Sequence, residues 1–160
     1  MKNKAVALIA TILICEIAGV IGSLFTYQSI PDWYNTSKLN KPSFTPPSWL
    51  FAPVWVTLYF LMGVSAYLIW EKGAKKKEVR NALSIFGVQL FLNVLWSILF
   101  FGLRCPLCGF VEIILLWLAI AATIIKFNKL SRAAAFLLIP YILWVTFAAL
   151  LNFYVWMLNP

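Results

Sequence analysis

Two cysteines three positions apart are the first residues in this sequence that could do chemistry. Cys105 and Cys108 form the segment CPLC, which has the spacing of a thioredoxin-type redox motif. That motif works in a β-α-β context, which the surrounding sequence does not provide, and two thiolates fall short of the four ligands of a structural zinc site. We therefore interpret the pair as incidental thiols or as a local disulfide on an oxidising face, and Cys15 as a small packing residue.

Histidine is absent from the sequence, and only five residues are acidic. The lack of histidine excludes a His-ligated haem, a His-containing zinc site and a His-based triad within this chain. Glu16 and Glu112 lie inside long apolar stretches, where an ionisable side chain is costly and often functional. A proton relay normally uses a chain of such groups, so a structural hydrogen bond is favoured for Glu112, and the role of Glu16 stays open. We predict no catalytic residue and no metal site.

Aromatic and amide residues recur at helical spacing in three stretches. These residues are Phe51, Trp55 and Tyr59 in the first stretch, Gln89, Asn93, Trp96 and Phe100 in the second, and Trp144, Ala148, Leu151 and Asn152 in the third. Ordinary packing, with amides bonding neighbouring helices, explains much of this pattern. It explains Trp144 less well, because this residue lies far from the end of its stretch and four positions after Pro140, where a kink could open a cavity.

The elements that carry these residues are five long apolar stretches. Of 160 residues, 63% are hydrophobic and 17% aromatic, whereas soluble domains have roughly 45–50% apolar residues. Each stretch can cross a hydrocarbon core of about 30 Å, which takes about 20 helical residues. We predict an all-α membrane protein, a five-transmembrane-helix bundle that forms a single domain over residues 1–160, with a long linker at 28–48. The predicted helices are residues 5–27, 49–70, 81–101, 107–127 and 133–157.

Two other interpretations of the apolar stretches fit less well. A β-barrel would alternate apolar and polar residues over about 10 positions, and these stretches are apolar all round. A cleaved signal peptide at the start would have an apolar region of about 7–15 residues, and the first stretch is longer and contains Glu16.

Basic residues are distributed unevenly between the two sides of the predicted bundle. The N-terminus and the second and fourth loops share ten of them, and the opposite side has three, Lys38, Lys41 and Arg104. The positive-inside rule therefore predicts a cytoplasmic N-terminus, with the linker and the C-terminus on the other side. The net charge of +8 reflects this topology and attraction to anionic membrane lipid, and it predicts no nucleic-acid partner, because the basic residues sit in short loops.

Several segments, taken in order, resemble the translocator protein family (TspO, also called the peripheral-type benzodiazepine receptor). The resemblance extends over essentially the whole chain. Its segments are WY at 33–34, KPSFTPPSW at 41–49, APVWVTLY at 52–59, QLFLNVLWSILFFG at 89–102 and PYILWVTFAALLNFYVW at 140–156.

The resemblance implies a five-helix bundle, often a homodimer, that binds porphyrins and synthetic aromatic ligands in a pocket between helices. The linker would cover that pocket, and Lys41 would pair with a porphyrin propionate at its rim. By position, the family pocket falls on Phe51, Trp55, Tyr59, Asn93, Trp96, Trp144, Phe147, Ala148 and Leu151, and the lid on Trp33, Lys41, Pro42, Pro46 and Pro47.

Two segments depart from the family pattern. The linker segment WYNTSKLNKP is two residues longer than the common pattern, which leaves the position of the lid open. The cholesterol motif of animal members needs a basic residue after the tyrosine near the C-terminus, and Met157 stands at the end of the corresponding segment. We expect weak sterol binding or none.

Three functions remain after these steps. A tetrapyrrole-binding regulatory membrane protein is preferred, with a protoporphyrin-like ligand, no required cofactor and no enzymatic activity. A tetrapyrrole transporter is second, because no internal repeat or pair of broken helices is evident. A light-dependent porphyrin-degrading enzyme, an activity that the resemblance implies for some members, is third. The predicted location is the cytoplasmic membrane of a bacterium.

Overall fold

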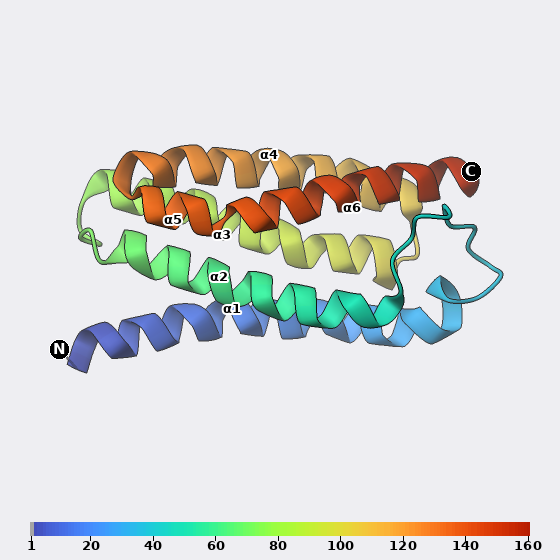
Figure 1. Cartoon of the computed structure of the whole chain (residues 1–160), viewed down its shortest axis with the longest axis horizontal. Coiled ribbons are helices and arrows are strands. Elements are labelled where there is room, and N and C mark those ends of the chain that lie inside the picture. Colours follow the sequence, from blue (N-terminus) through green and yellow to red (C-terminus); the bar gives the residue numbers. More distant parts are fainter. Residues whose placement is uncertain (1) are drawn as a thin grey trace.

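A computed structural model describes the backbone of residues 2–160 and the side chains from Lys4 onward. The described chain is a bundle of long helices that run alternately up and down (Figure 1). Its elements are α1 (Lys2–Ser29) continued by η1 (Ile30–Tyr34), η2 (Ser48–Leu50) leading into α2 (Phe51–Trp70), α3 (Lys77–Ser97) continued by η3 (Ile98–Gly102), α4 (Pro106–Leu130), α5 (Arg132–Leu137) and α6 (Ile139–Leu158).

Within residues 2–160, five helical segments are long and apolar enough to cross a membrane, the shortest with 23 residues and the longest with 31. Large apolar side chains cover the outside of the bundle; Ile9, Leu24 and Phe91 are 58–66% exposed. A water-soluble bundle would place such a surface in its core, and a bilayer solvates it with lipid. The predicted five-helix membrane protein is confirmed. The segments are Lys4–Tyr34, Ser48–Trp70, Lys77–Gly102, Pro106–Leu130 and Arg132–Leu158.

The first span runs further than the sequence predicted. Instead of ending at residue 27, α1 continues to Ser29 and then widens into the π-helical turn η1. Pro31 has no amide hydrogen to give, and the wider turn accommodates it, with the Asn35 amide donating to the Ile30 carbonyl at 2.9 Å. The predicted linker at 28–48 is therefore shorter, and Trp33 lies in a helical turn instead of the linker.

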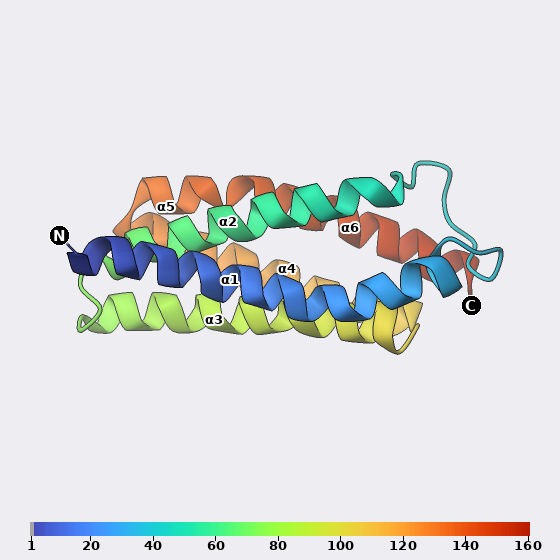
Figure 2. The same ribbon diagram turned by 90° about the horizontal axis from the view of Figure 1, so that it is seen from below.

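The last span is interrupted near Pro140, where the sequence suggested a kink. Helix α5 ends at Leu137 and α6 begins at Ile139. The break occurs because Pro140 has no amide hydrogen to donate to the last turn of α5. α5 packs against α2, whereas α6 packs against α4 and diverges from α2 toward the C-terminus (Figures 1 and 2). This divergence leaves space between α2 and α6 at one end of the bundle.

The connections fall at two opposite ends of the bundle (Figures 1 and 2). One end has the N-terminus, the α2–α3 loop and the α4–α5 turn. The other end, here called the linker end, has the linker, the α3–α4 turn and the C-terminus. The described basic side chains near the first end are Lys4, Lys72, Lys75, Lys76, Lys77, Arg80, Lys126, Lys129 and Arg132, and those at the linker end are Lys38, Lys41 and Arg104.

We expect the linker end to face away from the cytoplasm, since basic loops are retained inside. Lys75 and Ser37 are both exposed, at opposite ends. In a background with Cys105 and Cys108 replaced by serine, Ser37→Cys should react with a membrane-impermeant maleimide on intact cells, and Lys75→Cys should react only after lysis. The opposite labelling pattern would reverse the orientation.

Candidate functional site

Aromatic rings fill the bundle at the linker end. The π-helical turn η3 directs two consecutive rings inward, and Phe100 and Phe101 are only 3% and 5% exposed. Phe100 stacks on Trp96 at 5.3 Å between ring centroids and meets the edge of Trp33 at 5.5 Å. This cluster joins η1, α3 and η3 at the level where the linker crosses the bundle.

A first cavity of about 370 Å³ lies between α1, α2 and α3. Helix α2 contributes aromatic side chains at successive turns, and Glu16 and Gly19 line the α1 side. Gly19 is required there because a Cβ atom would lie 2.5 Å from the ring of Tyr59. Five of the residues predicted for the pocket line this cavity, namely Phe51, Trp55, Tyr59, Asn93 and Trp96.

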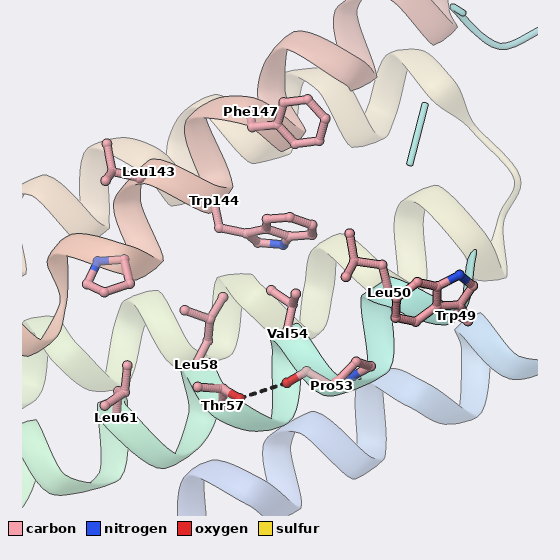
Figure 3. A pocket seen from close by; sticks show the side chains of 11 residues that line it. Trp49, Leu50, Pro53, Val54, Thr57, Leu58, Leu61, Leu143, Trp144 and Phe147 are labelled. Atoms are coloured by element: carbon pink, nitrogen blue, oxygen red, sulfur yellow. Dashed lines mark hydrogen bonds between the residues drawn. The ribbon is translucent and has the colours of Figure 1, made fainter. Parts of the chain in front are cut away.

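A second, larger hollow of about 750 Å³ occupies the space between α2 and α6 and is called here the α2–α6 groove (Figure 3). Trp144 extends from α6 toward Leu50 of η2 and Val54 of α2, with Phe147 one turn further along α6. The hydroxyl of Thr57 donates to the Pro53 carbonyl of its own helix at 2.8 Å, so the groove presents almost purely apolar groups. The lining residues are Trp49, Leu50, Pro53, Val54, Thr57, Leu58, Leu61, Pro140, Leu143, Trp144 and Phe147.

The side chains of Phe51 and Trp55, here called the aromatic partition, line the first cavity, and neither is among the residues that line the α2–α6 groove. The Phe51 ring meets the edge of Trp144 at 6.2 Å, and the Trp55 ring meets the edge of Tyr141 at 6.4 Å. Residues predicted for a single pocket thus line two different spaces, the first cavity and the α2–α6 groove.

The remaining predicted pocket residues belong to α6. Trp144 and Phe147 line the α2–α6 groove. Ala148 is half-buried against the core, and Leu151 is 5% exposed. Ala148 and Leu151 are not among the residues that line either cavity, and a contact of theirs with a ligand stays a prediction.

Hydrogen bonds cross the core beside the first cavity. The Tyr59 hydroxyl donates to Asn93 Oδ1, and Asn93 Nδ2 donates to the Tyr141 hydroxyl at 2.7 Å. The Tyr141 hydroxyl donates in turn to Gln89 Oε1 at 2.9 Å. Because these groups satisfy one another, the Tyr59 hydroxyl and the Asn93 amide at the cavity wall are already engaged. Tyr141 was not among the predicted site residues, because it is a lone tyrosine after Pro140 with no polar neighbour at helical spacing.

A second amide links the aromatic cluster to α6. Asn152 Oδ1 accepts from Trp96 Nε1 at 3.2 Å, and Asn152 Nδ2 donates to the Ala148 carbonyl at 2.8 Å. The Trp96 indole is therefore fixed in orientation with its face stacked on Phe100. The sequence pattern correctly indicated that Asn152 bonds a neighbouring helix.

The linker is fastened to the linker end at several points. Asn40 and Asn159 bond reciprocally: the Asn40 amide donates to Asn159 Oδ1 at 2.9 Å, and Asn159 Nδ2 donates to the Asn40 carbonyl at 2.8 Å. Phe44 meets the edge of Tyr154 at 5.4 Å and of Phe147 at 6.4 Å. The linker therefore covers the C-terminal half of α6, beside the α2–α6 groove.

Lys41 lies on the inner side of this linker. Its Nζ is 4.3 Å from the centre of the Tyr34 ring and donates to Asn35 Oδ1 at 3.3 Å. Partial burial lowers the pKa of Lys41. The Tyr34 ring in turn meets Phe51 at 6.1 Å, so Lys41 is two contacts from the aromatic partition. Of the predicted lid prolines, Pro42 and Pro46 are half-buried and Pro47 is exposed.

Two acidic and three cysteine residues were also singled out by the sequence. Glu16 is half-buried and lines the first cavity. The hydrogen bond favoured for Glu112 is not found: this side chain is 3% exposed, and neither oxygen has a partner among the described residues. Cys105 and Cys108 form a disulfide, the second of the two interpretations, and Cys15 is free and buried.

Comparison with known proteins identifies relatives of this chain. A match to the TspO/MBR family covers residues 11–157. The tryptophan-rich protein TspO of Chlorobaculum tepidum is 43% identical over the full length of both chains, and that of Archaeoglobus fulgidus is 47% identical over 95% of this chain and 96% of its own. The translocator protein of Ovis aries is 41% identical over 88% of this chain and 83% of its own. The chain therefore belongs to the TspO/MBR family of membrane proteins.

Proposed function

We propose that this protein binds a tetrapyrrole of the protoporphyrin class against the aromatic partition, at the linker end of the bundle. The observation that carries the proposal is the pair of apolar spaces, about 750 and 370 Å³, that lie on either side of the contact between Phe51 and Trp144. Both volumes lie within the range of roughly 300–1,000 Å³ that is usual for small-molecule sites. A flat macrocycle placed on either side has an indole or phenyl face to stack on.

The α2–α6 groove is the proposed seat of the macrocycle. It is lined by Trp49, Trp144 and Phe147 and opens between two helices whose outer surfaces face lipid. An apolar ligand dissolved in the bilayer can therefore enter it without crossing water. Rotation of the Phe51 ring away from Trp144 would join the groove to the first cavity and admit a larger ligand.

The rim of the site supplies the charge that such a ligand needs. Tetrapyrroles of this class carry carboxylates, which are costly to bury without a partner. Lys41 lies over the ring of Tyr34, and Tyr34 contacts Phe51 of the aromatic partition. The ammonium group of Lys41 would pair with a propionate of the ligand. The macrocycle would lie in the apolar groove and its carboxylates at the linker.

Binding is preferred to transport and to light-driven degradation. The family relatives are named as tryptophan-rich and translocator proteins, and none of these names is that of an enzyme. The engaged hydroxyl and amide groups beside the first cavity favour recognition by stacking over acid–base chemistry. Flux into proteoliposomes would reveal transport, and new absorption bands after illumination would reveal degradation.

Trp144→Ala should weaken binding of metal-free protoporphyrin about tenfold, equivalent to about 1.4 kcal/mol, because the main stacking surface of the groove is lost. Trp156→Ala is the matched control: its indole stacks on Phe110 of α4 at 5.6 Å, away from both cavities. Quenching of the remaining tryptophans in a titration measures affinity, and thermal melts check the fold. Equal losses in both variants, or losses that follow melting temperature, would place the ligand elsewhere.

A further inference from the structure

The Cys105–Cys108 disulfide closes the turn between η3 and α4 at the linker end. Arg104 turns the chain with a left-handed backbone (φ 52°), and the Cys105 amide donates to the Leu99 carbonyl at 3.3 Å. Both cysteines are partly exposed, and their neighbours Leu103 and Leu107 are 65% and 47% exposed. The disulfide is thus at the surface of the bundle and not in its core.

The two sulfur atoms have different surroundings. Cys105 is the N-cap of α4, and its Sγ accepts from the Cys108 amide at 3.2 Å. α4 continues for 25 residues, so a negative charge on this sulfur would meet both an amide hydrogen and the positive end of a long helix dipole. The amide hydrogen and the helix terminus each stabilise a thiolate at Cys105.

Cys108 is the third residue of α4, past the cap position, and no hydrogen bond to its sulfur is found among the described residues. Glu112 follows one helical turn later on the same face. Glu112 is 3% exposed and has no partner among the described residues, so it gives no help to a second negative charge nearby. The pair is therefore asymmetric, with one sulfur suited to leave as an anion and the other not.

We propose that Cys105–Cys108 is a reversible thiol–disulfide exchange site, which accepts electrons from a thiol reductant at the linker end and releases Cys105 as the thiolate. This proposal does not depend on tetrapyrrole binding. A thiolate of the reductant attacks Cys108 Sγ, the S–S bond breaks, and its electron pair leaves on Cys105 Sγ. A second thiolate of the reductant then displaces Cys108, and the reductant departs as its own disulfide. The chain gains two electrons and one proton, which goes to Cys108; Cys105 is left as the thiolate, and the second proton of the reductant passes to solvent.

The first experiment measures the redox equilibrium of the full chain in detergent, in a Cys15→Ser background. Samples are equilibrated with reduced and oxidised glutathione, and free thiols are counted by mass after alkylation. A disulfide of purely structural type resists the glutathione pool, whereas an exchange site is reduced by it. We expect both cysteines to be alkylated in reduced glutathione, with unchanged far-UV circular dichroism. A disulfide that opens only in dithiothreitol, or only as helicity is lost, would overturn the proposal.

The second experiment tests the asymmetry with single-cysteine variants in the same background. Cys108→Ser leaves Cys105 free, and Cys105→Ser leaves Cys108 free. At about pH 6.5 an ordinary thiol is almost entirely protonated, so Cys105 should react with iodoacetamide at least about tenfold faster than Cys108. The rates should converge at about pH 9.5. Equal or reversed rates at the lower pH would contradict the assignment of Cys105, and circular dichroism of both variants confirms that each is folded.

Discussion

Replacing Gly63 with alanine should destabilise the bundle by about 1–3 kcal/mol, the usual cost of overpacking a closed interface. Gly63 of α2 packs directly against the backbone of α1. A Cβ atom there would lie 2.5 Å from Ile12 Cα and 2.9 Å from the Ile12 backbone nitrogen. These are backbone atoms of a continuous helix, so α1 itself would have to shift. Small residues at helix contacts play this part throughout membrane proteins.

Gly87→Ala is the matched control for that substitution. Gly87 is on the exposed face of α3, and a Cβ atom there would have no atom within 4 Å. Alanine should raise stability by up to about 1 kcal/mol, because it is the better helix former. Unfolding in mixed micelles, followed by circular dichroism, measures both variants. A change of the same sign and size in both would show that the α1–α2 contact is looser than the structure has it.

Replacing Asn93 with leucine should cost about 2–3 kcal/mol, because two buried hydroxyl groups lose a partner at once. Tyr59 would have no acceptor for its proton, and the Tyr141 hydroxyl would lose the donor Asn93 Nδ2. Both tyrosine side chains are buried, so water cannot readily replace the amide.

Tyr59→Phe separates the hydrogen bonds of Asn93 from its packing. This change removes the hydroxyl that needs an acceptor, so the double variant should be less destabilised than the sum of the two single variants. The coupling energy is measured by the same micelle unfolding. Strict additivity would mean that Asn93 stabilises the core by shape alone.

The membrane-spanning helices could be predicted from the local sequence, because the length of an apolar stretch decides whether a helix can cross a bilayer. It also indicated which faces turn inward, and Tyr59, Asn93 and Trp96 are buried as helical spacing implied. It missed the end of α1, because Pro31 reads as the start of a linker unless the helix can widen around it.

Contacts between segments that are distant in the chain could not be predicted from local sequence. The linker is held by Asn40 and Asn159, which are 119 positions apart and bear no local signal of pairing. Helical spacing grouped Phe51 and Trp144 with the other aromatic residues of their helices, and it could not predict that their rings would meet. Such features depend on how far α6 diverges from α2, which only the packed bundle determines.

The length of the first span has a consequence for where the site meets the lipid headgroups. Its 31 residues make a helix about 46 Å long at 1.5 Å per residue, well beyond a hydrocarbon core of about 30 Å. One end is tied by Lys4 to Glu71 at 2.6 Å, so the excess length raises η1 toward the opposite headgroup layer. Ser29 donates to the Phe101 carbonyl at 2.6 Å, which ties η3 to the same level. In a thinner bilayer α1 must tilt or protrude further, and the Tyr34–Lys41 rim moves with it between hydrocarbon and hydrated headgroups.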